Sequence, residues 1–188
     1  MIEPSRRIVL TETEAIVTPR DPKARHNFGP ISHRDNTLFT AERPGHPGTN
    51  GVPTHIVEDW ICFIKSKGIN TVLIIMDNNE FGVYEVDLKE LYESAGLEVY
   101  HIPFSSNDSY ERTMSLMRDL DAKGRKVVSH CTGGKGRCGR LACAWLCLKW
   151  SLSPPEASQE FIDQAVENGL YRLGDVQKLK DWMGYGSW

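Results

Sequence analysis

The stretch VVSHCTGGKGRCGRLACAWL, residues 127–146, carries the strongest structural signal in the chain. It begins as a short apolar run typical of a buried strand and ends in an apolar segment of helical length. Between the two lies a turn with three glycines, Gly133, Gly134 and Gly136. Glycines let successive backbone N–H groups curl inward, and the first N–H groups of a helix have no partner and carry partial positive charge. The stretch therefore predicts a strand, an anion-binding loop and a helix in direct succession.

Two side chains in this segment indicate which anion the loop binds and how the bound anion would react. Cys131 starts the loop, where inward-facing N–H groups stabilise a thiolate, so we expect its pKa to lie well below the ordinary value of about 8.5. Arg137 lies at the start of the helix, and its planar guanidinium matches two oxygen atoms of a phosphate group. A nucleophile, a cradle of amides and a guanidinium together suit a phosphate monoester, and they do not suit an acyl group.

The spacing of His130, Cys131 and Arg137 matches the HC-x5-R signature of the protein tyrosine and dual-specificity phosphatase superfamily. From about residue 38 to the C-terminus the chain resembles the small atypical dual-specificity phosphatases. The resemblance implies a cysteinyl-phosphate mechanism in which Cys131 is the nucleophile and Arg137 the phosphate clamp, with no metal and no organic cofactor. The residues that would line the substrate-binding loop are Thr132, Gly133, Gly134, Lys135, Gly136, Arg137 and Cys138.

Two neighbours of the nucleophile have roles implied by the same resemblance. His130 would orient the loop and help to hold the pKa of Cys131 low, a role compatible with that of a core histidine at a strand end. Lys135 resembles the lysine of phosphoinositide 3-phosphatases, where it favours highly acidic headgroups. The alternative for Lys135 is a solvated loop lysine.

Cys138 departs from the family pattern, which has Ser or Thr after the arginine. A thiol is a weaker hydrogen-bond donor than a hydroxyl, so hydrolysis of a cysteinyl-phosphate could be slowed. Two cysteines so close to the loop also suggest a reversible disulfide that protects Cys131 from overoxidation. The alternative is that Cys138 is simply a small residue at the start of the helix.

The general acid is the second departure. Relatives carry an Asp three residues after a proline in the loop that follows the preceding strand. Counting from Pro103 puts Ser106 at that place, and Asp108 is the nearest acid. We therefore expect Asp108 to protonate the leaving group. Its spacing to Glu111 is also that of a capping box, so a cap at the start of the next helix is one alternative. The other is that a different residue, or none, acts as the acid.

The rest of the chain alternates strand-like and helix-like segments, which predicts an α/β fold. We expect a central, mainly parallel sheet of four to five strands flanked by helices. The expected strands are residues 36–41, 71–76, 97–102 and 126–130. The expected helices are 54–67, 87–95, 109–122, 137–150, 153–168 and 175–183. Residues 1–20 are expected to form an N-terminal extension, and residues 21–188 a single phosphatase domain.

The composition of the chain limits which partners and which cellular compartment we expect. The 188 residues carry a formal net charge of -3, which argues against general binding to nucleic acid. No stretch reaches the ~20 apolar residues of a membrane span, and no secretory signal is evident. Five cysteines without CxxC spacing predict reduced thiols in a cytoplasmic setting. Of these, Cys62, Cys143 and Cys147 are expected to be small buried apolar residues.

The sequence thus predicts a phosphatase that acts on a phosphoprotein, carrying phosphotyrosine or phosphoserine/threonine, or on an acidic phosphorylated small molecule. One alternative is the same chemistry on a phosphoinositide or another non-protein phosphate. Another is a catalytically weak pseudophosphatase that only binds phosphate. A rhodanese-type or cell-cycle phosphatase fold with the same loop is a third, which the C-terminal helices disfavour.

Overall fold

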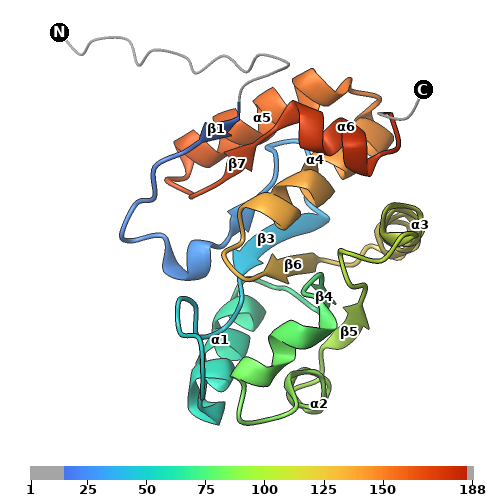
Figure 1. Ribbon diagram of the computed structural model, residues 1–188. Helices are drawn as coiled ribbons and strands as arrows, with labels where there is room; N and C mark the ends of the chain where they lie inside the picture. Colours follow the sequence, from blue (N-terminus) through green and yellow to red (C-terminus); the bar gives the residue numbers. More distant parts are fainter. Residues whose placement is uncertain (1–14, 186–188) are drawn as a thin grey trace, which may run out of the picture.

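The computed structural model describes residues 15–185 and has a five-stranded sheet at its centre (Figure 1). The strands lie in the order β2-β3-β6-β4-β5, and β3, β6, β4 and β5 are parallel to one another. The antiparallel strand β2 lies at one edge. The strands are β2 (Gly29–Pro30), β3 (Leu38–Glu42), β4 (Thr71–Ile74), β5 (Glu98–His101) and β6 (Val127–Cys131). The expected mainly parallel sheet is confirmed.

Helices cover both faces of this sheet. Figure 1 shows α1 (Thr54–Ser66) and α2 (Leu88–Ser94) on one side and α4 (Gly136–Trp150) on the other. Helices α5 (Pro154–Glu167) and α6 (Val176–Trp182) pack against α4, and α3 (Ser109–Ala122) joins the same side. Each expected helix is present within a few residues of its expected ends.

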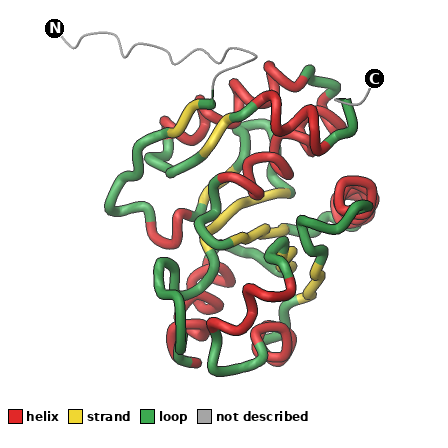
Figure 2. Tube along the Cα trace, viewed as in Figure 1, coloured by secondary structure: helices red, strands yellow, loops and turns green. Residues whose placement is uncertain are grey.

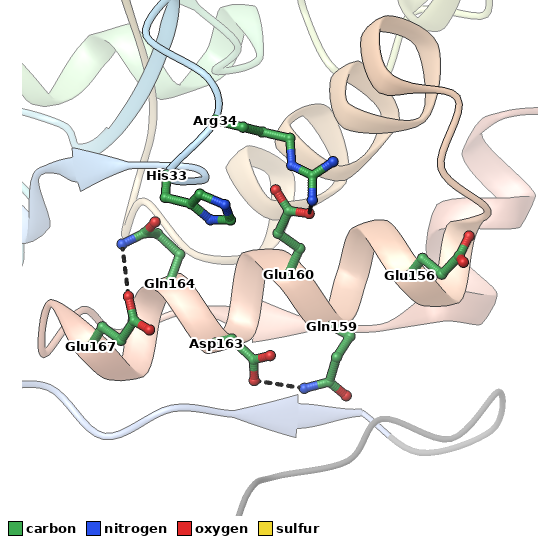
Figure 3. Close-up of a pocket in the computed structure, with 8 residues that line it drawn as sticks. All are labelled: His33, Arg34, Glu156, Gln159, Glu160, Asp163, Gln164 and Glu167. Carbon is green, nitrogen blue, oxygen red and sulfur yellow. Dashed lines mark hydrogen bonds and ion pairs between the residues drawn. The ribbon is translucent and has the colours of Figure 1, made fainter.

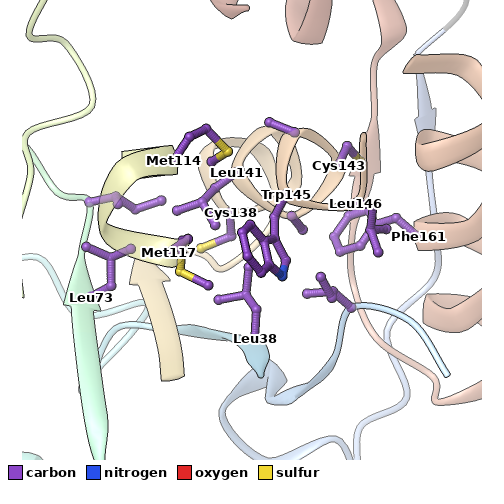
Figure 4. Packing of buried hydrophobic residues seen from close by; sticks show 14 of the residues in the cluster. Leu38, Leu73, Met114, Met117, Cys138, Leu141, Cys143, Trp145, Leu146 and Phe161 are labelled. Atoms are coloured by element: carbon purple, nitrogen blue, oxygen red, sulfur yellow. The ribbon is translucent and has the colours of Figure 1, made fainter. Parts of the chain in front are cut away.

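The two faces have separate cores because successive residues of a strand point to opposite sides. Val72 and Val128 pack with α1 and α2, whereas Leu73 and Val127 pack with α3 and α4. All four side chains are fully buried. In the larger core, Trp145 points from α4 toward β3 (Figure 4). Burial on both faces explains why the strands are short continuous apolar runs.

The N-terminal part of the described chain contains structure that the sequence did not suggest. The two-residue strand β1 (Ile16–Val17) pairs antiparallel with β7 (Leu173–Gly174), beside the C-terminal helices (Figure 2). The short 3₁₀ helix η1 (Arg25–Asn27) is also present there, and a second one, η2 (Asn78–Val83), follows β4 in the middle of the chain. Residues 15–20, part of the expected extension, therefore lie against the domain, and residues 1–14 lie outside the described residues.

One expectation about the cysteines is wrong. Cys143 is buried and Cys147 is partly buried, but Cys62 is exposed. The apolar face of α1 is formed by Val57, Trp60 and Ile64, and Cys62 falls on the opposite, solvent-facing side of the helix.

Candidate active site

Cys131 is the last residue of β6, and its side chain is buried at the carboxyl end of the sheet. The neighbouring strand β3 fixes its backbone, because the N–H of Arg43 donates to the carbonyl of Cys131 at 2.9 Å. The loop then passes so close to β3 that a Cβ at Gly134 would lie 2.5 Å from the carbonyl carbon of Ala41. Gly134 also has a φ of +68°, so this position requires glycine on two grounds.

The loop lowers the pKa of Cys131 to about 6. The largest cause is a hydrogen bond from the thiol of Cys138, whose sulfur lies 3.4 Å from that of Cys131. Burial opposes this effect, and the N–H groups of Cys138 and Gly134 and the charge of Arg137 reinforce it. Burial and the adjacent thiolate raise the pKa of Cys138 well above its ordinary value. One negative charge therefore resides on Cys131 at neutral pH.

Arg137 is held at the first turn of α4 by an acid that the sequence did not point to. Its Nη2 donates to Glu80 Oε1 at 2.7 Å and to Thr132 Oγ1 at 2.8 Å, and its Nη1 donates to Glu80 Oε2. Burial alone would raise the pKa of Glu80, but the hydrogen bonds from Arg137 and Thr132 lower it to about 2. The ion pair uses the two terminal nitrogens, and the Nε edge of the guanidinium takes no part in it.

His130 lies beneath the loop as a neutral side chain. It is fully buried, its Nε2 lies 3.1 Å from the hydroxyl of Tyr92, and the ring of Trp60 meets it edge-on. Burial lowers the pKa of His130 to about 3, so the imidazole carries no charge at neutral pH. Any support that His130 gives to Cys131 is therefore by orientation rather than by charge.

Lys135 has a specific partner. Its Nζ donates to the hydroxyl of Tyr171 at 3.0 Å and lies 4.5 Å from the centre of that ring. The lysine is therefore directed along the rim of the loop toward the segment before β7.

The structure places Asp108 at the N-terminal end of α3 with 62% of its side chain exposed, 3.6 Å from Arg112. The capping box with Glu111 is not formed, because the carboxylate makes no capping hydrogen bond. Ser106, which occupies the family's acid position, donates through Oγ to the carbonyl of Pro103.

A different carboxylate lies beside the clamp. Asp77 Oδ2 is 3.6 Å from Arg137 Nη1, and Asp77 Oδ1 accepts hydrogen bonds from both the N–H and the Oγ of Ser105. Asp77 thus connects Arg137 to the loop in which relatives carry their acid. Asp77 and Glu80 both follow β4, whose carboxyl end adjoins that of β6. In an open parallel sheet, ligands bind at the carboxyl ends of the strands. The position of Asp77 and Glu80 just after an expected strand was therefore the sequence signal that could have pointed to both residues.

A separate cavity of about 390 Å³ lies between residues 33–34 and α5 (Figure 3). Arg34 reaches across it to Glu160 at 3.0 Å, and the other lining side chains are mostly carboxylates and amides. None of its lining residues belongs to the loop of Cys131, so this cavity is not the candidate site.

Residues 15–185, the described part of the chain, contain neither a candidate metal site nor a candidate membrane-spanning helix. No group of three or more His, Cys, Asp or Glu side chains is arranged to hold a metal ion. No helix in this part of the chain combines the length and apolar character needed to cross a bilayer.

The fold and the loop together define an α/β protein with an anion-binding site built around an ionised cysteine. Residues 51–177 match the family model described as "Swiss Army Knife protein, DSP-PTPase phosphatase domain". The chain therefore belongs to the dual-specificity phosphatases of the cysteine-dependent protein tyrosine phosphatase superfamily.

One curated relative is similar to the chain in sequence, and solved phosphatase structures share its fold. The mouse (Mus musculus) cyclin-dependent kinase inhibitor 3 is 32% identical over 125 residues, which are 63% of this chain and only 56% of the mouse protein. A structure of kinase associated phosphatase with its catalytic site cysteine replaced by serine superposes with a TM-score of 0.61 at 20% identity, over 79% of this chain and 84% of that one. The active form of Tk-PTP superposes with a TM-score of 0.58 at 22% identity, over 83% and 95%.

Proposed function

We propose that the chain hydrolyses phosphate monoesters through a covalent phosphate on Cys131. The observation that carries the proposal is the position of the Cys131 sulfur, buried at the end of β6 and 3.4 Å from the sulfur of Cys138, in a loop closed by Arg137 at the first turn of α4. The lowered pKa of Cys131, about 6, supports it. An ionised sulfur, inward N–H groups and a guanidinium beside it form a nucleophile and an oxyanion clamp within one short segment.

In the first step, the Cys131 thiolate attacks phosphorus in line with the ester oxygen. The S–P bond forms as the P–O bond breaks, and the leaving oxygen takes a proton from an acid. Arg137 and the N–H groups of residues 132–137 bind the three equatorial oxygens. The ion pair with Glu80 holds Arg137 in place and leaves its Nε edge for the phosphate.

In the second step, water attacks the cysteinyl-phosphate, inorganic phosphate leaves, and Cys131 returns as a thiolate. Cys138 stabilises that leaving thiolate, because its thiol already donates to the sulfur at 3.4 Å. A thiol is a weak donor, which favours a slow second step.

The chain offers two candidates for the proton donor. Asp108 is the candidate that the sequence predicts, and it requires the loop before α3 to bring an exposed side chain to the phosphate. Asp77 is favoured by its position between Ser105 and Arg137. A carboxyl group in this role contributes about 10²- to 10⁴-fold to the rate.

The proposed substrate is a phosphoprotein, carrying phosphotyrosine or phosphoserine/threonine, or an acidic phosphorylated small molecule, in a reducing compartment such as the cytoplasm. Lys135 adds positive charge to the rim of the loop and so favours acidic groups next to the phosphate. A phosphoinositide is the alternative within the same chemistry. The alternative without hydrolysis is a pseudophosphatase that only binds phosphate.

The test is hydrolysis of para-nitrophenyl phosphate in reductant and EDTA by wild type and by Cys131→Ser. Turnover by wild type that Cys131→Ser abolishes would support the proposal. A folded, reduced wild type that binds vanadate but does not turn over would instead indicate the phosphate-binding alternative.

A further inference from the structure

Asn27 touches the catalytic loop from a segment that precedes the family match. Its side chain is fully buried. Its Nδ2 donates to the carbonyl of Gly133 at 3.1 Å and to that of Tyr171 at 2.9 Å, and its Oδ1 accepts from the N–H of Tyr171 at 2.9 Å. One amide group therefore ties the loop to the segment before β7.

The bond to Gly133 has a consequence for the next residue. A peptide group is planar and trans, so a carbonyl and the following N–H point in opposite directions. When Asn27 holds the carbonyl of Gly133, the N–H of Gly134 must face the other way. That N–H is one of the donors that lower the pKa of Cys131.

We propose that Asn27 is a positioning residue that fixes the Gly133–Gly134 peptide so that the N–H of Gly134 faces the sulfur of Cys131 and the bound phosphate. For the phosphate, the inference rests on the proposed function. For the thiolate, it stands on the described contacts alone.

The surroundings of Asn27 hold it in this place. Its φ is +48°, a conformation that Asn tolerates better than most residues. The guanidinium of Arg172, also fully buried, donates to the carbonyl of Asn27 at 2.7 Å and to that of Thr40 at 3.2 Å. Arg172 thus anchors the Asn27 backbone to β3, the strand on which Gly134 packs.

A purely structural role is the competing explanation, and the chain contains a control for it. Thr18 is also fully buried and also ties the N-terminal segment to residues 170–172. Its Oγ1 donates to the carbonyl of Leu170 at 2.5 Å and accepts from the N–H of Arg172 at 2.8 Å. Within the described part of the chain, the hydrogen bonds of Thr18 reach only residues 170 and 172 and none of residues 131–137, so Thr18→Val removes its side-chain tie without touching the loop.

The experiment measures the pH dependence of alkylation at Cys131. Iodoacetamide-treated protein is digested with trypsin, which separates Cys131, in residues 127–135, from Cys138. Vanadate affinity and thermal unfolding are measured on the same samples. The variants are Asn27→Asp, which keeps the size and the acceptor but loses the N–H donor, Asn27→Ser, which replaces the amide by a shorter hydroxyl without adding charge, and Thr18→Val.

We expect Asn27→Asp to move the alkylation midpoint upward by about one pH unit and to weaken vanadate binding about tenfold, since the N–H of Gly134 is no longer held toward the thiolate and the bound anion. Asn27→Ser should also raise the alkylation midpoint and weaken vanadate binding, but by a smaller amount. Thr18→Val should lower the unfolding temperature and leave the alkylation midpoint and the vanadate affinity unchanged. The proposal is overturned if both Asn27 variants keep the wild-type midpoint, or if Thr18→Val shifts it equally.

Failure of the proposed function gives a different result. If wild type hydrolyses no phosphate monoester but the Asn27 variants still shift the alkylation midpoint, the positioning role stands and the hydrolase proposal does not.

Discussion

The sulfur atoms of Cys131 and Cys138 lie 3.4 Å apart, and both are buried. The Cys138 thiol donates to the Cys131 thiolate and is the largest single cause of its lowered pKa. Cys138, at the place where the family pattern has a hydroxyl, thus contributes to the electrostatics around Cys131 and lowers the pH at which the Cys131 thiol ionises.

Removal of this donor should be visible in a pH profile. Since the pKa of Cys131 is about 6, the thiolate forms as the pH rises through 6. In Cys138→Ala we expect the acid limb of kcat/KM to move to higher pH by about one unit or more, because a hydrogen bond to the charged form is lost. Cys138→Ser should keep the limb in place and speed breakdown of the intermediate. Cys143→Ala, which removes another buried thiol of α4, should change neither.

The same contact predicts an oxidation product. Peroxide converts the Cys131 thiolate to a sulfenic acid. The Cys138 sulfur then attacks it, an S–S bond forms, and water leaves with the Cys138 proton. We expect one disulfide between peptides 127–135 and 138–140 after tryptic digestion, and full recovery of activity with a dithiol. Cys138→Ser should instead lose activity irreversibly under the same treatment, and equal recovery of both proteins would contradict a protective role.

The proton donor can be identified from leaving groups. The true donor, changed to Asn, should lose about 10²- to 10⁴-fold with phenyl phosphate and much less with para-nitrophenyl phosphate, whose leaving oxygen needs little help. Asp77→Asn and Asp108→Asn are each other's control, because one lies beside Arg137 and the other is exposed beside Arg112. If a variant lost the same small amount of activity with both esters, the substituted residue would not be the proton donor.

Glu80 should matter for both binding and stability. In Glu80→Gln the clamp loses its charged partner, so we expect vanadate affinity to fall about tenfold or more as Arg137 becomes mobile. The folded pKa of about 2 lies below the ordinary 4.5, so this carboxylate stabilises the fold above pH 4.5, and the stabilisation is lost as the pH falls toward 2. It amounts to at most about 3 kcal/mol.

Urea unfolding between pH 3 and pH 7 measures this contribution. The difference in unfolding free energy between wild type and Glu80→Gln should shrink as the pH is lowered. Glu93→Gln, at an exposed position of α2, is the control and should show no such trend.

Local patterns were enough to predict the sheet, the helices and the core of the site. The strand before Cys131, the glycine turn and the helix that carries Arg137 are contiguous, so their geometry follows from one segment. At the helix starts, the side chain of Asp87 caps α2, and Ser153 and Glu156 form a capping box at the start of α5.

The supporting residues come from elsewhere and could not be predicted in the same way. Glu80 lies in a 3₁₀ turn without periodicity, and it meets Arg137 only because β4 and β6 are neighbours. Asn27 meets Tyr171 across 144 positions of sequence, through a backbone with positive φ. The two-residue strands β1 and β7 are too short to leave a pattern.

The pairing of β1 with β7 determines how far the chain can be shortened from its N-terminal side without loss of these contacts. Residues 51–177 contain Cys131 and Arg137, but they omit Thr18 and Asn27, which hold the segment before β7 and, through Asn27, the loop that starts at Cys131. A fragment trimmed to the matched residues would also expose β7 and the buried guanidinium of Arg172. For this chain, the folded domain therefore includes β1, and a fragment that keeps these contacts must begin at or before Ile16, well before the point at which the match to the family model starts.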